Sequence, residues 1–96
     1  MRVVLSGQVV DFIRRLAPEP KGRLRRALRG LARGRGDIKA LEAPLVGYYR
    51  LRVGGYRVVL AYGKRATIEC IFAEQRSLVY ELLLERLRDR LRTGRE

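Results

Sequence analysis

Hydrophobic and polar residues alternate most clearly across residues 48–62, on both sides of the Gly54-Gly55 pair. Two alternating runs around a Gly-Gly pair are a strong signal for a β-hairpin with a two-residue turn, in which both glycines adopt positive φ. Successive residues of a strand point to opposite faces, so one face of the hairpin should be apolar. The residues of that face are Tyr49, Leu51, Val53, Tyr56, Val58, Leu60 and Tyr62.

The opposite face of the predicted hairpin carries arginines. A two-residue turn fixes the register, which places Arg52 opposite Arg57 and Arg50 opposite Val59. The three guanidinium groups should then share one patch, with their Cβ atoms roughly 5–8 Å apart. Like charges so placed are mildly destabilising, whereas planar guanidinium groups bind phosphate in bidentate fashion. The pattern predicts a polyanion site, and the alternative is that these long side chains simply extend into water.

The N-terminal third of the chain predicts one strand and two helices. Arg2–Leu5 is a short β-branched run that suits an outer strand, and Ser6 suits the N-cap of a first helix. The prolines within residues 18–20 end that helix, and Pro20 can begin a second helix that extends to about Ala32. The apolar residues at helical spacing are Val9, Phe12, Ile13 and Leu16 in the first helix, and Leu24, Ala27, Leu28 and Leu31 in the second.

After the helices, the pattern predicts a connection, the hairpin, a further strand and a last helix. Residues 34–47 are rich in glycine and form the connection, from which Ile38 and Leu41 should contact the core. The further strand spans about residues 66–73, and the last helix spans roughly residues 78–91. In the further strand, Ile68, Cys70 and Phe72 alternate with Thr67, Glu69 and Ile71.

The order of predicted elements is strand, helix, helix, three strands, helix. A chain of 96 residues is long enough for one modest core, so we expect a single domain over residues 1–96. An antiparallel sheet of about four strands, with helices packed on one face, is the economical arrangement of these elements. The predicted fold class is α+β.

Charge narrows the choice of partners. The net charge is +12, from 22 lysines and arginines against 10 acidic residues, which favours a nucleic acid or an acidic protein as partner. The arginines of the second predicted helix are either a solvated helix surface or direct RNA contacts, and in both cases they add to the field that attracts phosphate. These residues are Arg23, Arg25, Arg26, Arg29 and Arg33.

Several classes of protein do not fit the composition. The sequence has neither eighteen consecutive apolar residues nor the pattern of a signal peptide, so we expect a cytosolic protein with no membrane segment. Cys70 is the one cysteine and histidine is absent, which leaves no internal disulfide and no ligand set for zinc. With apolar flanks, Cys70 suits a small core residue rather than a reactive thiol. We expect no metal and no cofactor.

The hairpin sequence resembles a known family. Residues 49–58, with Leu41 and Gly47 before them and Arg76 and Tyr80 after them, resemble the RelE/ParE superfamily of toxins from type II toxin–antitoxin systems, and are closer to the RelE branch. The resemblance covers nearly the whole chain and implies the compact fold of that family, in agreement with the order of elements predicted above. It also implies a cognate antitoxin as partner.

The resemblance to RelE implies a ribosome-dependent mRNA endoribonuclease, or mRNA interferase. Toxins of this type enter the decoding site of the ribosome and cut mRNA there, by attack of a 2′-hydroxyl on the adjacent phosphate. The products are a cyclic phosphate and a free 5′-hydroxyl. By resemblance, the catalytic residues are Arg50, Arg52, Arg57, Arg76 and Tyr80.

The residue types determine which steps of this reaction the site can support. Arginine stabilises the dianionic phosphorane well, but it is a poor base because it stays protonated. Some relatives carry lysine at the positions of Arg50 and Arg52, and others use histidine or glutamate, so the general base is not identified by the resemblance. The candidates for acid–base work are Glu42, Glu69, Glu74 and Tyr80.

Two other functions remain open at this point. ParE-type relatives inhibit DNA gyrase by binding it, and they are not nucleases. A basic RNA-binding module without activity is the third possibility, and it predicts RNA affinity that weakens steeply with salt. Under either toxin hypothesis, the charge of +12 predicts an acidic, partly disordered antitoxin segment that folds over the arginines or the helices.

Overall fold

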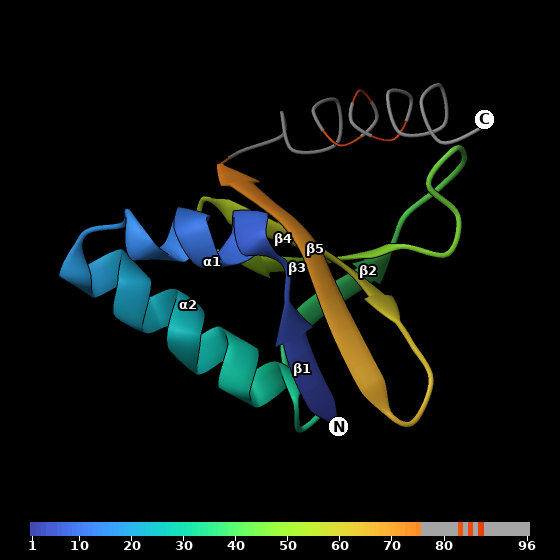
Figure 1. Ribbon diagram of the computed structural model, residues 1–96, viewed down its shortest axis with the longest axis horizontal. Coiled ribbons are helices and arrows are strands. Elements are labelled where there is room, and N and C mark those ends of the chain that lie inside the picture. The colour runs from blue at the N-terminus through green and yellow to red at the C-terminus, as the bar shows by residue number, and fades with distance from the viewer. Residues whose placement is uncertain (76–82, 84, 86, 88–96) are drawn as a thin grey trace.

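The computed structural model describes residues 1–75 together with residues 83, 85 and 87, and Figure 1 shows the arrangement of the elements. Seven elements follow one another in these residues. They are β1 (Arg2–Leu5), α1 (Gly7–Arg14), α2 (Pro18–Leu31), β2 (Asp37–Ala40), β3 (Tyr49–Val53), β4 (Tyr56–Tyr62) and β5 (Thr67–Gln75).

The strands form one mixed sheet in the order β1-β5-β4-β3-β2, with α1 and α2 on one face (Figure 1). The prediction of an α+β fold is confirmed, but the prediction of about four antiparallel strands is wrong in two respects. There are five strands in the described residues, and β1 pairs with β5 in parallel, from Arg2 opposite Thr67 to Leu5 opposite Cys70. This pairing joins segments more than sixty residues apart, which no local pattern indicates.

Strand β2 is the element that the sequence pattern missed. It has only four residues, Asp37–Ala40, and just one of them, Ile38, is apolar and partly buried. The glycines around it led to the prediction of a connecting segment. Its pairing with β3 places Asp37 opposite Arg52 and Lys39 opposite Arg50, at the edge of the sheet.

The main core lies between the sheet and the two helices. Ser6 caps α1 by accepting a hydrogen bond from the backbone N–H of Val9 at 3.2 Å, as predicted. Helix α2 begins at Pro18 rather than Pro20, because a proline in the first helical turn leaves no hydrogen bond unmade. Apolar residues from both helices and the three central strands fill this core, namely Val9, Ile13, Leu24, Leu28, Leu31, Leu51, Val58, Leu60, Ile68, Cys70 and Ala73.

A second, smaller core lies on the other face of the sheet. Val59 of β4 and Phe72 of β5 are buried there together with Leu45 and Leu83. Leu83 and Leu87 are helical, one turn apart, and Leu87 also packs against this core. The rest of the predicted last helix lies outside the described residues.

A β-bulge in β5 supplies the second core with Phe72. The register shifts between Val59 and Leu60, so that Val59 faces Phe72 while Leu60 faces Cys70, and Ile71 is the additional residue. The predicted alternation that placed Cys70 and Phe72 on the same face is therefore wrong at Phe72. A bulge adds one residue to one strand, and every side chain beyond it changes face relative to a regular strand.

The side chain of Gln8 connects α1 to the edge of β5 by two hydrogen bonds. Its side-chain amide donates to the carbonyl oxygen of Ala73 and accepts from the N–H of Ala73, both at 2.7 Å. Ser6 makes two more contacts along the same edge, donating from its backbone N–H to Cys70 and from its hydroxyl to Ile71, each at 2.9 Å. Strand β1 pairs with β5 only as far as Cys70, so the backbone groups of β5 beyond that residue have no strand partner on this side. The contacts of Ser6 and Gln8 supply hydrogen-bond partners for these groups.

Candidate phosphate-binding site

The β3–β4 hairpin positions the arginines as predicted. Arg52 pairs with Arg57 and Arg50 pairs with Val59, which confirms the register. Opposed residues share a face, so all three arginines lie on the face opposite α1 and α2. The turn differs in one detail: Gly54 has φ +60°, whereas Gly55 lies outside the positive-φ region. One left-handed glycine at the first turn position is enough to match the twist of the two strands.

The arginines form part of a charged row across the sheet. Strand pairing places Asp37, Arg52, Arg57 and Glu74 side by side on four neighbouring strands. The two cations are at the centre of the row and the two carboxylates are at its ends. We call Arg50, Arg52 and Arg57 the hairpin cluster. The structure thus adds two acidic residues, one on each side, to the patch that the hairpin alone predicts.

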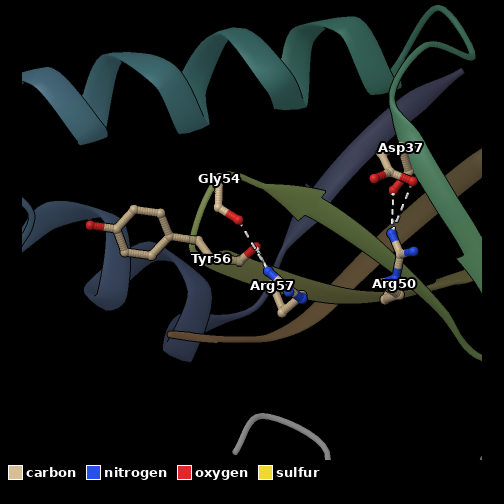
Figure 2. Close-up of polar contacts among 5 residues, drawn as sticks. All are labelled: Asp37, Arg50, Gly54, Tyr56 and Arg57. Carbon is tan, nitrogen blue, oxygen red and sulfur yellow. Dashed lines mark hydrogen bonds and ion pairs between the residues drawn. The ribbon is translucent and has the colours of Figure 1, made fainter. Parts of the chain in front are cut away.

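Arg50 is held by Asp37. Its Nη1 donates to the carbonyl oxygen of Asp37 at 2.9 Å and to the carboxylate of Asp37 at 3.1 Å (Figure 2). The Arg50 side chain is only 15% exposed, against 57% for Asp37. The guanidinium group is therefore fixed in position, but part of its charge is neutralised by the neighbouring carboxylate.

Arg57 and Arg52 carry the uncompensated charge of the hairpin cluster. Arg57 folds back over the turn, where its Nη1 donates to the carbonyl oxygens of Gly54 at 3.2 Å and Tyr56 at 3.1 Å (Figure 2). Arg52 is exposed and makes no side-chain hydrogen bond or ion pair with the described residues. Neither has a carboxylate partner in that part of the chain, so both can offer N–H donors to an anion.

Two further cations border this site that the sequence pattern did not assign to it. Lys39 lies opposite Arg50 on the same face of the sheet and is exposed. Arg23 of α2 reaches the hairpin turn, where its Nη1 lies 2.8 Å from the position that a Cβ atom of Gly54 would occupy. Lys39 was missed because β2 was not recognised as a strand. The contact of Arg23 depends on how α2 packs, for which the sequence gives no signal.

The predicted acid–base candidates lie at different distances from the hairpin cluster. Glu74 faces Arg57 directly, whereas Glu69 pairs with Ala61 towards the other end of the face, and Glu42 is exposed in the loop before β3. Glu69 lines a cleft of about 620 Å³ with Ser6, Gln8, Tyr48, Phe72 and Leu83, among others. An exposed carboxylate in that cleft repels phosphate, so the cationic end of the face is the better anion site.

Arg76 and Tyr80, the other two residues predicted for the site, lie outside the described residues. Within the residues that the structure does describe, no three His, Cys, Asp or Glu side chains are grouped so as to hold a metal ion. No helix among these residues is long and apolar enough to cross a membrane. Cys70 is buried, and burial raises the pKa of its thiol to about 12, as expected for a core residue.

Neither a protein-family model nor a curated protein matches the chain. Solved structures do match. A YoeB/ParE toxin from Agrobacterium tumefaciens superposes with a TM-score of 0.65 at 21% identity, over 80% of this chain and 100% of that chain. The chain has the fold of the RelE/ParE toxins.

Two more structures share this RelE/ParE toxin fold. The toxin–antitoxin complex RelBE2 from Mycobacterium tuberculosis matches with a TM-score of 0.66 and 19% identity, over 78% of this chain and 90% of that chain. The isolated RelE toxin of E. coli matches with a TM-score of 0.62 and 18% identity, over 90% and 97%. At these identities the likeness is one of fold, and function must be argued from the site.

Proposed function

We propose that this chain is the toxin of a toxin–antitoxin system and acts as a ribosome-dependent mRNA endoribonuclease. The observation that carries the proposal is the hairpin cluster itself. The Gly54 turn brings Arg50, Arg52 and Arg57 onto one face of the sheet, away from both helices, and two of the three have no carboxylate partner among the described residues. The RelE/ParE toxin fold supports the same proposal, because RelE toxins have this fold.

The proposed reaction is transfer of the phosphate to the neighbouring 2′-hydroxyl. The 2′-oxygen attacks phosphorus as its proton leaves to a base, the bond to the 5′-oxygen breaks, and that oxygen takes up a proton. Arg52 and Arg57 bind the non-bridging oxygens, whose negative charge grows towards the phosphorane. Arg50, fixed by Asp37, orients the substrate phosphate.

Glu74 is the general base that the described geometry supports best. It faces Arg57 across β4 and β5, which separates the two Cβ atoms by about 4.5–5.5 Å. A carboxylate accepts a proton where a guanidinium group does not, and the neighbouring cation holds the phosphate within its reach. Arg76 and Tyr80 remain in the proposal by resemblance, Arg76 as a further phosphate ligand and Tyr80 for acid–base work or for stacking on a base.

The test is to induce the protein in cells and map the 5′ ends of mRNA. The variant Arg52→Gln/Arg57→Gln removes both uncompensated cations, and Arg15→Gln/Arg65→Gln removes the same charge from exposed positions elsewhere. We expect cleavage and growth inhibition to be lost in the first variant and kept in the second. Equal cleavage by both variants would remove the hairpin cluster from the mechanism.

One observation favours a different target. Asp37 neutralises part of Arg50, and one structure with this fold is named a YoeB/ParE toxin, so a ParE-like inhibitor of DNA gyrase is the second candidate function. Such an inhibitor binds protein and needs no base. A supercoiling assay with purified gyrase separates the two: inhibition without new mRNA 5′ ends supports the ParE-like function. RNA affinity with neither effect supports a non-catalytic RNA-binding module.

The proposal includes a cognate antitoxin of acidic character. The matched structure from Mycobacterium tuberculosis is a complex of toxin and antitoxin. In this chain, a groove of about 390 Å³ between β1, α1 and α2 has an apolar floor and three arginines on its rim. Its lining residues are Leu5, Val10, Ile13, Arg14, Arg25, Leu28 and Arg29. An acidic, partly apolar antitoxin segment complements this groove, and co-expression of the antitoxin should then relieve toxicity.

A further inference from the structure

The outer surface of α2 is rich in arginine and glycine after its first turn. The buried side of the helix is formed by Leu24, Leu28 and Leu31. At about 100° per residue, the positions opposite that stripe are occupied by Glu19 in the first turn, which pairs with Arg23 at 3.1 Å, and after it by glycines and exposed arginines. We call this surface, with the turn that follows it, the α2 ridge. It comprises Gly22, Arg26, Arg29, Gly30, Arg33 and Arg35.

The turn after α2 completes the ridge. The carbonyl oxygen of Gly30 accepts hydrogen bonds from the N–H groups of both Arg33 and Arg35, each at 2.9 Å. This folds the chain back on the helix end, so that Arg35 joins Arg26 and Arg33 around a shallow cleft of about 350 Å³. None of the four ridge arginines makes a side-chain hydrogen bond or ion pair with the described residues.

Stability does not explain the composition of the ridge. Arginines spaced three and four residues apart on a helix repel one another, and glycine is the poorest helix former after proline. The favourable interaction of cations with a helix C-terminus accounts for Arg29 and Arg33, but not for the glycines. Nor does packing require them. A Cβ atom at Gly22 would approach only the flexible end of Arg26, at 3.3 Å, and one at Gly30 would make an ordinary contact at 3.7 Å.

We propose that the α2 ridge binds the phosphate backbone of a double-stranded nucleic acid. Arg26 lies on α2 and Arg33 lies in the turn just after it, seven residues further on, and a span of roughly 10 Å for seven helical residues is enough to contact about two successive phosphates of one strand. Glycines leave the helix surface low, so that a phosphate backbone can approach while the flanking guanidinium groups hold its oxygens. The ridge lies on the opposite side of the sheet from the hairpin cluster, and the proposal holds whether or not that cluster cleaves RNA.

The chemistry of the ridge distinguishes among polyanions. A single strand is usually held by aromatic side chains on which its bases stack, and residues 18–35 contain none. An acidic protein segment gains affinity by burying apolar surface, and the ridge offers only glycine and arginine. The groove with the apolar floor is the surface that suits such a segment. A duplex backbone needs only cations and close approach.

The first test compares two variants of the full chain that carry the same net charge. Arg26→Gln/Arg33→Gln/Arg35→Gln removes three ridge charges, and Arg2→Gln/Arg15→Gln/Lys64→Gln removes three exposed charges elsewhere. Affinity for a 16-base-pair RNA duplex and for a DNA duplex of the same length is measured by fluorescence anisotropy over a range of salt concentrations. We expect the ridge variant to lose about 10-fold or more in affinity and to flatten the salt slope by about 2–3, with little change in the control.

The second test keeps every charge. Gly22→Ala/Gly30→Ala should raise the melting temperature, because alanine is the better helix former, and yet weaken duplex binding by several-fold, because the added methyl groups hold the backbone away. A variant that folds better and binds worse cannot be explained by misfolding. The ratio of RNA to DNA affinity identifies which duplex is preferred.

Three results would overturn the proposal: equal losses in the ridge and control variants, unchanged duplex binding in the alanine variant, or binding of polyglutamate that is as tight as duplex binding and equally dependent on the ridge. The last would assign the surface to an acidic protein. The variant Arg52→Gln/Arg57→Gln should bind duplex within about 2-fold of the parent chain. Cleavage by that variant therefore reports on the proposed nuclease, and its duplex binding reports on the α2 ridge, so the two proposals can fail separately.

Discussion

Arg50 and Asp37 form the one ion pair of the hairpin cluster among the described residues, and its strength is modest. Asp37 is 57% exposed, so its attraction for Arg50 is screened by water, and its removal should change the free energy of unfolding by less than about 1 kcal/mol. The carboxylate has a larger effect on an incoming phosphate, which it repels. We therefore expect Asp37→Asn to raise affinity for a short single-stranded RNA by several-fold while leaving the melting temperature nearly unchanged.

Equilibrium titration with labelled RNA, beside thermal unfolding, checks this expectation. Asp11→Asn is the matched control, because Asp11 is exposed and, in the part of the chain that the structure describes, pairs only with Arg14 on α1, at 3.8 Å. If the Asp37 variant loses stability and gains no affinity, Arg50 has a structural role and is not a phosphate ligand.

Cys70 makes the stability of the fold depend on pH in the alkaline range. Burial raises the pKa of its thiol from 9.0 to about 12. The unfolded chain ionises near pH 9 while the folded chain does not, so the contribution of Cys70 is complete below pH 9 and is lost progressively up to pH 12. At pH 10 the loss should be about 1.4 kcal/mol, which is one pKa unit.

The measurement is the free energy of unfolding at pH 8 and pH 10 for the parent chain and for Cys70→Ala. The cavity in the variant lowers its free energy of unfolding equally at both pH values, so it does not affect the change between pH 8 and pH 10. The titration of tyrosines and lysines is common to both proteins and cancels when their changes are compared. Stability should fall more steeply with pH in the parent chain. Identical slopes would show that the thiol ionises equally in both states.

At the scale of elements, the contact between Gln8 and β5 explains how α1 is fixed to the sheet. Gln8→Ala would leave both the N–H and the carbonyl of Ala73 without these partners, and Ala73 is fully buried. A buried polar group without a partner costs about 1–3 kcal/mol, so the variant should lose about 2–4 kcal/mol in a urea titration. Gln8→Glu, which keeps an acceptor for the N–H but loses the donor, should also be destabilised.

Gln75→Ala is the control for that series, because Gln75 is exposed in the same strand and its side chain makes no hydrogen bond with the described residues. A Gln8→Ala variant as stable as this control would mean that water replaces both hydrogen bonds.

Some elements could be predicted from the sequence and others could not. The difference depends on whether an element is determined by neighbouring residues or by contacts between segments far apart in the chain. The register of β3 and β4 could be predicted because two glycines and a two-residue turn determine it locally. The bulge at Ile71 could not, because it depends on which side chains the two cores must accommodate. The parallel pairing of β1 with β5 and the short strand β2 depend on contacts between distant segments, for which the single sequence carries no signal.

The same distinction applies to the candidate site. The three hairpin arginines were predicted to share a face because they lie within eight residues of one another. Lys39, Asp37 and Arg23 reach the site from β2 and α2, so their places depend on tertiary packing. Glu74 was one of four acid–base candidates in the sequence, but its place opposite Arg57, at one end of the row that Asp37 ends on the other side, follows only from the pairing of four strands.

At the scale of the whole molecule, two cationic surfaces lie on opposite sides of one sheet. The hairpin cluster suits a single-stranded phosphate, and the α2 ridge suits a duplex backbone. A single RNA that carries both features should therefore bind through both surfaces, because the second contact becomes intramolecular once the first is made. The principal extents of the chain are 42 × 30 × 22 Å, so a strand must pass around an edge of the sheet to reach from one surface to the other.

We expect an RNA duplex with a single-stranded tail of about 15 nucleotides to bind at least 10-fold more tightly than the same duplex with blunt ends. Shortening the tail to about 3 nucleotides should abolish the gain, because so short a segment cannot span the molecule. Arg52→Gln/Arg57→Gln should lower affinity for the tailed RNA to that of the blunt duplex while leaving blunt-duplex binding unchanged. If the tail adds affinity in this variant as well, the hairpin cluster is not the surface that holds the single strand, and the tail binds wherever the net charge of +12 attracts it.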